Sequence, residues 1–403
     1  MVKLDSTGWQ NTNSVLRYSD GQWDTLGVLR QLVYSMVEYH DTLISTGLFT
    51  MVDDSLPVDH IVYWNGQQWL PYGSFQPVGA RKLRVIDDTL YAVGSMDTAD
   101  GQYVHGITRR VGGQWQPVGS LVTDGYSIMG DIVKFEDHLV AIGSGAINGE
   151  LRVFQLQDSV WSILGGGIQG GLCSAQCLAV YNGDLYVGGQ ITMACGNPGQ
   201  GMLRWDGSAW QPVGLGLQYA LGDFSSFAGP TTMVEHDGKL FIGGGFRYAG
   251  GVEAFGIATW DGTEWCGVTG NFSNGVGHTG VYSMDFYHDT LFVAANMADD
   301  DSVNFAAKFI GTEYADSCAM VLTALPIQSP MPTNSMVITL ASDILTAHLP
   351  VGASPCPIAL LDGLGRVIST RNGTTVRFSA ARLAKGVYIV RAEGYGAQRV
   401  LFE

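Results

Sequence analysis

The chain has 403 residues, of which 46% are hydrophobic, 14% are charged and 55 are glycine. This composition can fill a large core and is too apolar for a disordered protein. No apolar run approaches the roughly 18 residues of a membrane-spanning helix. The formal net charge is −16, with 14 Lys/Arg against 33 Asp/Glu in residues 1–325. Such an acidic body disfavours nucleic acid and anionic membranes as partners and leaves cations, neutral glycans and proteins.

A short aromatic hairpin recurs along the chain. Its second aromatic residue falls at steps of 46, 46, 46, 49, 55 and 49 residues, which indicates a repeat architecture. Asn-Gly and Asp-Gly between apolar residues predict tight type I′ hairpins. We therefore interpret the tryptophans, including Trp260 and Trp265, as packing residues rather than as a sugar-binding patch. The seven copies are Tyr18–Trp23, Trp64–Trp69, Arg110–Trp115, Leu156–Trp161, Trp205–Trp210, Trp260–Trp265 and Phe309–Tyr314.

A second hairpin of alternating apolar residues precedes six of the seven aromatic hairpins. One repeat is then four strands, which we name a, b, c and d, at the length of a propeller blade. The paired glycines that end strand b, followed by a tryptophan in strand d, resemble kelch-type repeats, and this resemblance implies a β-propeller. The a–b hairpins are Ser35–Gly47, Leu83–Gly94, Asp131–Gly143, Cys177–Gly189, Met233–Gly245 and Ser283–Ala295.

The number of blades depends on how the ring closes. Seven blades, the favoured count, require Gly8–Asn13 to supply strand b and Ala319–Leu325 to supply strand a of the first blade. Closure of this kind hides the edge strands of the ring. Six blades with an additional hairpin is the alternative.

Pro326–Asn334 contains three prolines and indicates a linker. We place a propeller at 1–325, the linker at 326–333 and a small β-sandwich at 334–403. Within the last segment, LLDGLGRVI (Leu360–Ile368) followed by LAKGVYIVR (Leu383–Arg391) resembles the type A C-terminal sorting domain of the type IX secretion system. The motif residues in this resemblance are Asp362, Gly365, Arg366, Leu383, Gly386, Val387, Tyr388 and Arg391.

This resemblance implies transport through the Sec pathway and then across the outer membrane of a Gram-negative bacterium. The secretion machinery would bind residues 330–403, and the protein would be secreted or held on the cell surface. Met1–Gln10 has no apolar core like that of a signal peptide.

The a–b and c–d turns are all tight, whereas the b–c and d–a connections vary in length and content. We predict that any ligand binds on the face formed by these variable connections, the loop face. Aromatic residues there could stack on sugars or anchor a protein, or could instead hold the loops in place. The candidates are Asp97, Asp100, Tyr103, His105, Tyr126, Tyr219, Phe224, Phe227, Phe272 and His278.

Acidic b–c loops raise the question of calcium, which binds six to eight oxygens. Asp299, Asp300 and Asp301 are the candidate ligands, although exposed aspartates also serve as turn formers. The six cysteines match no zinc spacing. Cys173 or Cys177 could bridge to Cys195, and buried free thiols are the alternative.

No G-x-S-x-G, H-E-x-x-H or P-loop motif is present, so the sequence does not favour an enzyme. His40, His138, His236 and His288 fall in or beside tight a–b turns, away from the loop face. The favoured function is an exported or cell-surface propeller that binds a glycan, a matrix polymer or a protein. The alternatives are a secreted glycan lyase or hydrolase, and a structural subunit of a surface assembly.

Overall fold

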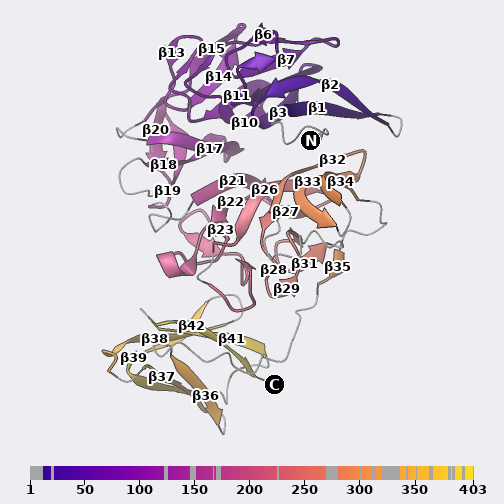
Figure 1. Cartoon of the computed structure of the whole chain (residues 1–403). Helices are drawn as coiled ribbons and strands as arrows, with labels where there is room; N and C mark the ends of the chain where they lie inside the picture. The colour runs from indigo at the N-terminus through magenta and orange to yellow at the C-terminus, as the bar shows by residue number, and fades with distance from the viewer. Residues whose placement is uncertain are drawn as a thin grey trace. The chain divides into compact units, whose positions relative to one another are not determined.

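The computed structural model is all-β (Figure 1). It describes residues 12–19, 22–121, 126–145, 151–166, 168, 174–224, 227–268, 280–299, 302–309, 315–318, 336–341, 344–350, 352–362, 366–379, 383, 386–392 and 395–402. The chain forms two compact units, an N-terminal unit of Met1–Val187 with Asn304–Ala307 and a C-terminal unit of Gly188–Val303 with Lys308–Glu403.

Apart from two small sheets built from connections, seven sheets follow one another along the described part of residues 12–317, and the chain is a β-propeller with blades of four-stranded antiparallel meanders. Three blades have strands a to d in chain order with no addition. They are β3 (Val33–Tyr39), β4 (Thr42–Gly47), β7 (Ile61–Trp64) and β8 (Trp69–Pro71); β10 (Ala80–Ile86), β11 (Thr89–Gly94), β14 (Ile107–Val111) and β15 (Gln114–Pro117); and β21 (Ser174–Tyr181), β22 (Asp184–Gln190), β23 (Met202–Trp205) and β24 (Trp210–Pro212).

Two further sheets gain a fifth strand at the strand d edge. The first comprises β17 (Tyr126–Phe135), β18 (His138–Gly145), β19 (Leu151–Gln157) and β20 (Val160–Ile163), with β16 (Ser120–Leu121) parallel to β20. The second comprises β26 (Gly229–His236), β27 (Lys239–Gly245), β30 (Ile257–Trp260) and β31 (Trp265–Val268), with β35 (Ala315–Ser317) antiparallel to β31.

The first and last sheets of the series depart from the standard blade. In the first, β1 (Thr12–Ser19) and β2 (Gln22–Arg30) are continued by β5 (Met51–Val52) and β6 (Leu56–Pro57). The last contains β32 (Gly280–Tyr287), β33 (Thr290–Asp299) and β34 (Ser302–Lys308). The predicted ring-closing segment Ala319–Leu325 lies outside the described residues, as does the Gly8–Asn11 part of the other closing segment. A 3₁₀ helix, η1 (Met193–Cys195), lies in the connection between β22 and β23.

The predicted a–b hairpins are confirmed, and so are the aromatic hairpins except Phe309–Tyr314, whose flanking strands β34 and β35 do not pair with each other. The type I′ turn predicted from Asn-Gly and Asp-Gly is wrong in three aromatic hairpins, where Trp64–Trp69, Trp205–Trp210 and Trp260–Trp265 pair across four-residue loops. The a–b turns show why the hairpin signal was strong. His40 and Asp41 have φ of 49° and 56°, and Asp87 and Asp88 have φ of 47° and 58°. Both central residues of a type I′ turn require positive φ, which Asp, Asn and Gly tolerate best. The short polar turn residues therefore set the register of each a–b hairpin.

The second tryptophan is buried in five of the aromatic hairpins, as predicted for a packing residue, and in three of them it bonds to the neighbouring repeat. Trp260 and Trp265 are 6% and 5% exposed, and their rings lie 5.1 Å apart on paired strands. The indole Nε1–H of Trp161 donates to the carbonyl of Val118 at 2.7 Å. That carbonyl belongs to the third residue after Trp115, the corresponding tryptophan of the preceding repeat. The Trp161 indole thus ties strand d to the chain leaving the previous strand d.

The same spacing of donor and acceptor recurs in two other repeats. Trp115 donates to the carbonyl of Tyr72 at 3.2 Å, and Trp265 donates to that of Val213 at 3.1 Å. Trp69 and Trp210 are 1% and 9% exposed, but their indole nitrogens have no hydrogen-bond partner in the described part of the chain.

The cysteines are arranged differently from the pairing considered above. Cys266, at the start of β31, forms a disulfide with Cys318, which follows β35. Cys195 is a free thiol, so neither of the bridges considered for it exists. The expected final strand d, which would follow Phe309–Tyr314, is β35, and it pairs with β31 rather than with β34. The disulfide thus lies where the end of the repeat region joins an earlier blade.

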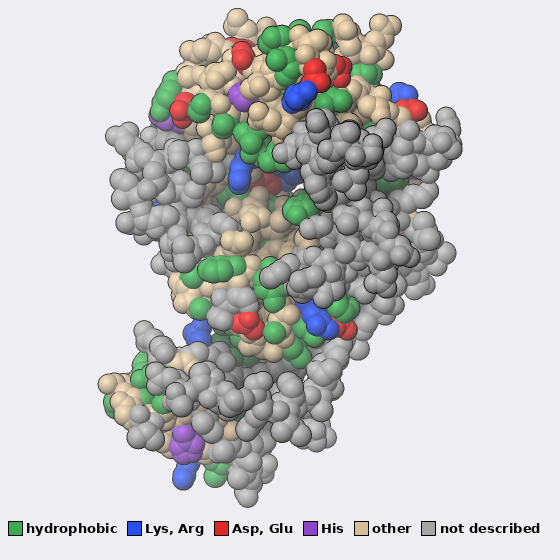
Figure 2. Space-filling model, in the orientation of Figure 1, with side chains coloured by type: hydrophobic (Ala, Val, Ile, Leu, Met, Phe, Trp, Pro, Cys, Tyr) green, Lys and Arg blue, Asp and Glu red, His purple; other side chains and the backbone are tan. Residues whose placement is uncertain are grey.

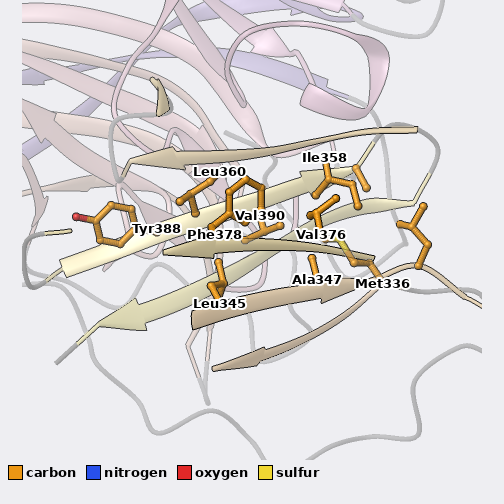
Figure 3. Packing of buried hydrophobic residues seen from close by; sticks show 11 residues of the cluster. Met336, Leu345, Ala347, Ile358, Leu360, Val376, Phe378, Tyr388 and Val390 are labelled. Carbon is orange, nitrogen blue, oxygen red and sulfur yellow. The ribbon is translucent and has the colours of Figure 1, made fainter. Parts of the chain in front are cut away.

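The C-terminal segment is a small β-sandwich (Figure 3). One sheet has the order β36-β37-β40 and the other β39-β38-β41-β42, and Val376, Phe378, Leu360 and Val390 pack between them. The strands are β36 (Val337–Ala341), β37 (Ile344–His348), β38 (Cys356–Asp362), β39 (Val367–Gly373), β40 (Thr375–Ser379), β41 (Gly386–Ala392) and β42 (Gly396–Phe402). The predicted linker at 326–333 lies outside the described residues, and the predicted domain limits remain predictions.

Among the helices of the described residues, none is long and apolar enough to span a membrane.

Candidate functional site

Two small three-stranded sheets stand beside the blades and are built from the variable connections. In the N-terminal unit, β9 (Phe75–Gln76) from a d–a connection pairs with β12 (Thr98–Ala99), which pairs with β13 (Gln102–Tyr103) in the next b–c loop. We call a small sheet of this kind a loop sheet. It shows that the b–c and d–a connections lie together on one face, as the sequence predicted, but as regular backbone rather than as free loops.

The C-terminal unit contains a second loop sheet with the same plan. β25 (Leu217–Gln218) pairs with β28 (Tyr248–Ala249), which pairs with β29 (Val252–Glu253). The backbone N–H of Asp97 donates to the carbonyl of Gln76 at 2.7 Å, and that of Arg247 donates to Gln218 at 2.9 Å. Residues 97–105 and 247–255 therefore occupy equivalent positions in the two loop sheets.

Asp100 has a structural role in the first loop sheet. Its carboxylate oxygens accept hydrogen bonds from the backbone N–H groups of Ser74 and Trp115, each at 2.9 Å. Gly73 has a φ of 132°, and a Cβ there would lie 2.8 Å from the Asp100 carboxylate, so only glycine fits. Asp53 binds the N–H of Val28 at 2.7 Å in the same manner. These carboxylates fasten loops to strands.

The exposed side chains of the first loop sheet include two predicted site residues in contact. Tyr103 is 60% exposed, and its ring meets that of His105 edge to face, with centroids 4.3 Å apart. His105 has a φ of 50° and Phe255, its equivalent in the second loop sheet, has a φ of 41°. Bulky residues rarely adopt this conformation, and such strain concentrates at functional sites. Asp97, a third predicted residue, is exposed on the same loop.

The second loop sheet holds a cluster that the sequence did not single out. The guanidinium of Arg247 donates from Nε and Nη2 to Oε1 of Glu253, at 3.2 and 2.9 Å. It also lies 5.5 Å from the ring centroid of Tyr248 and 5.2 Å from that of Phe255. The bond to Glu253 raises the pKa of Arg247 above its usual range. We call these four residues the Arg247 cluster.

This cluster is fixed in shape yet open to solvent. Half of the Arg247 side chain and a third of the Glu253 side chain are exposed, and both ring residues are partly buried. Stacking and the ion pair restrict the rotamers of the guanidinium, so less entropy is lost when a ligand binds. On the molecular face in view, Figure 2 shows acidic and basic side chains next to one another among hydrophobic ones.

The remaining loop-face candidates have different surroundings. Tyr219 directly follows β25, and burial raises the pKa of its hydroxyl. Phe227 is 37% exposed. Phe224 packs against a hydrophobic cluster in its own unit that contains Leu215 and Leu361. This packing fits the alternative in which the aromatic residues hold the loops in place. The side chain of Tyr126 and all of Phe272 and His278 lie outside the described residues.

The calcium prediction falls almost wholly outside the described structure. Asp299 ends β33, but its side chain is not described, and Asp300 and Asp301 lie beyond the described ranges. In the described part of the chain, no three His, Cys, Asp or Glu side chains are grouped so as to hold a metal ion.

A buried charge network that sequence reasoning missed joins three strands a of the N-terminal unit. Asp131 on β17 is fully buried and accepts bonds from Nε and Nη2 of Arg84 on β10, at 2.9 and 2.7 Å. It also accepts from the backbone N–H groups of Ile132 and of Leu178, the latter on β21. Burial by itself would raise the pKa of Asp131. The effect of burial is outweighed by Arg84, by the charge of Lys82 and by the hydrogen bond from the backbone N–H of Leu178, so the pKa is lowered.

Cys177 lies on β21 beside this network. Burial and the negative charge of Asp131 raise the pKa of its thiol well above the usual range. A thiol in this state is a poor nucleophile, because the thiolate is the reactive form. Cys177 is therefore a packing residue.

The motif residues of the sandwich form its turn and its core. The carboxylate of Asp362 accepts from the backbone N–H and from Nε of Arg366, at 2.9 and 2.7 Å, which closes the turn between β38 and β39. Tyr388 on β41 is 7% exposed in the sandwich core, and Leu383 packs against that core. Gly386, Val387 and Arg391 lie on β41, and Gly365 lies outside the described residues.

No protein-family model matches the chain, and no curated protein matches it. Solved structures that are similar include YCF48 bound to D1 peptide, with 12% identity over 70% of this chain and 83% of that one and a TM-score of 0.42. A puromycin-hydrolyzing peptidase of Mycobacterium tuberculosis has 12% identity over 85% of this chain and a TM-score of 0.47, and this chain spans 56% of its length. The Bacteroides ovatus xyloglucan PUL GH43B has 10% identity, 91% and 88% coverage and a TM-score of 0.32.

Proposed function

We propose that this protein is an exported binding propeller that holds a glycan on its loop face. The observation that carries the proposal is the Arg247 cluster, a charged pair whose guanidinium lies near two aromatic rings on a loop sheet. Binding residues gather where variable loops stand on a fixed scaffold. The second loop sheet supplies such a scaffold through backbone hydrogen bonds alone.

The chemistry of the Arg247 cluster suits a sugar. The guanidinium offers planar donors and the Glu253 carboxylate offers acceptors, which together match neighbouring hydroxyl groups. The rings of Tyr248 and Phe255 supply apolar surface for the C–H face of a pyranose. Because the ion pair is charge-balanced, the cluster does not require a charged ligand. Tyr103 and His105 offer a second, differently composed surface on the first loop sheet.

A glycan array probed with the full chain, with and without calcium, tests the proposal. We expect binding to one or more glycans, and we expect Arg247→Gln and Tyr248→Ala each to weaken it at least tenfold. Lys239→Gln, which removes an exposed cation beside a tight a–b turn, is the matched control and should bind as the unaltered chain does. If the array shows no binding while envelope extracts yield a stoichiometric protein partner, a structural subunit replaces this proposal.

We further propose that the C-terminal sandwich directs export through a type IX-like machinery. The support is the order of its motifs and the turn that Asp362 and Arg366 close. The Cys266–Cys318 disulfide also supports export, because disulfides persist in oxidising compartments. Deleting residues 330–403 should leave the propeller folded and trapped within the envelope of a Gram-negative host that has the machinery. Normal release of the truncated chain would refute the sorting role.

A further inference from the structure

Strand a carries a β-bulge at the same position in several repeats. The register shifts between Val33 and Ser35 in β3, and between Ala80 and Lys82 in β10. A bulge leaves one residue unpaired and turns its side chain to a new direction. The bulged residues in these two strands are Tyr34 and Arg81. The bulges therefore leave one residue unpaired at the same position of strand a in each of two neighbouring sheets.

A hydrogen bond between the two strands places these residues at the same level. The backbone N–H of Leu83 on β10 donates to Oγ of Ser35 on β3 at 3.0 Å. Tyr34 adjoins Ser35, while Arg81 and Lys82 lie within two residues of Leu83. Tyr34 is 38% exposed, Arg81 is exposed and Lys82 is partly buried. An aromatic ring, a hydroxyl and two cations therefore come from adjacent strands of the N-terminal unit.

Considering only the described residues, neither Arg81 nor Lys82 has an ion-pair or hydrogen-bond partner. Lys82 is close enough to Asp131 for its charge to act on that carboxyl, but Arg84 and two backbone amides already compensate Asp131. Strand β10 thus presents two cations with no direct ion pair among the described residues, one of which, Lys82, also acts on Asp131 through its charge, in a chain of net charge −16.

We propose that Tyr34, Ser35, Arg81 and Lys82 form a subsite for a uronic acid, that is, a sugar residue with a carboxylate. The cations would bind the carboxylate with charge-assisted hydrogen bonds. The Ser35 oxygen accepts from Leu83, so its hydrogen is free for a sugar oxygen, and the Tyr34 ring offers a stacking surface. Charges beyond a Debye length of about 8 Å are largely screened at physiological salt, so the local cations outweigh the acidic body. This subsite does not depend on the Arg247 cluster.

Calorimetric titration of the full chain with trigalacturonate tests the subsite, with its fully methyl-esterified form as the uncharged comparison. We expect the ester to bind at least tenfold more weakly than the acid. Arg81→Gln combined with Lys82→Gln should weaken binding of the acid by a similar factor and leave binding of the ester unchanged. Arg109→Gln removes an exposed cation from β14 of the same blade and should change neither.

Three outcomes would overturn the subsite. They are the absence of trigalacturonate binding, equal binding of acid and ester, and a double variant that melts like the unaltered chain yet binds the acid as tightly. The acid and ester comparison uses the unaltered chain, so the test holds even if the double variant is unstable. If the uronic-acid subsite is refuted, the glycan-binding role proposed for the Arg247 cluster is unaffected, because Arg247→Gln is tested against the glycans of the array and not against trigalacturonate.

Discussion

Replacing Asp131 by asparagine removes the buried charge that joins β10, β17 and β21 while keeping the shape of the side chain. Removing one partner of a buried ion pair costs about 3–5 kcal/mol. The Arg84 side chain is 30% exposed, so water can solvate the orphaned guanidinium, and we expect the lower end, about 3 kcal/mol. At about 2–4 °C per kcal/mol for a unit of this size, the melting temperature should fall by about 6–12 °C.

The pH dependence follows from the lowered pKa of Asp131. The ordinary value is 3.8, and the folded protein holds the carboxyl below it. The stabilisation is therefore complete above the unfolded pKa and is lost as the pH falls through the folded one. The difference in unfolding free energy between the unaltered chain and Asp131→Asn should be constant from neutral pH to about pH 5 and should narrow below pH 4.

Urea denaturation followed by tryptophan fluorescence, repeated between pH 3 and pH 7, measures the loss of unfolding free energy and its dependence on pH. Glu38→Gln is the matched control because it removes an exposed carboxylate from the neighbouring strand β3, and it should change stability by less than about 0.5 kcal/mol. If Asp131→Asn unfolds like the control at every pH, the network does not stabilise the blades and the reasoning fails.

Three further stability predictions follow from the same hydrogen-bond and disulfide inventory, each measured by chemical denaturation. Trp161→Phe leaves the buried carbonyl of Val118 without its donor, whereas the indole N–H of Trp210 has no partner to lose. Trp161→Phe should therefore lower the free energy of unfolding by about 1–3 kcal/mol more than Trp210→Phe does. Equal losses of unfolding free energy would argue against a stabilising role for the Trp161–Val118 hydrogen bond. Replacing Cys266 and Cys318 by serine opens a link across 52 residues and should cost about 2–4 kcal/mol, and an unchanged denaturation midpoint would contradict this. Asp100→Ala strips two backbone N–H groups of their acceptor and should cost about 2 kcal/mol, whereas unchanged stability would return Asp100 to the set of ligand-binding candidates.

Strand pairing and turn type in the a–b hairpins were predictable because their causes are local. Alternating apolar residues and short polar pairs such as His40 and Asp41 specify a hairpin without reference to the rest of the chain. The packing role of Trp265 was predictable because the residue recurs at a fixed spacing. The loop sheets were not predictable, because strands of two residues are too short to show a period of two.

The missed contacts are those between repeats. Arg84, Asp131 and Leu178 are separated by 47 residues at each step, and no local pattern couples them. Alignment of the repeats on their a–b turns offered a signal, since Asp131 places a carboxylate in a strand position that is otherwise neutral or basic. Cys266 and Cys318 lie in different repeats, and their pairing depends on β35 joining β31 rather than β34, which is a choice of partner that periodicity does not encode.

The two loop sheets have a consequence for how recognition can diversify in this molecule. Residues 97–105 and 247–255 have the same length, and main-chain hydrogen bonds to the preceding connection anchor both of them. Their outward positions hold aspartate and histidine in one sheet and arginine and phenylalanine in the other. The same backbone conformation thus presents unrelated sets of side chains. Substitutions in one loop sheet can therefore give it a new specificity while the other loop sheet keeps its own.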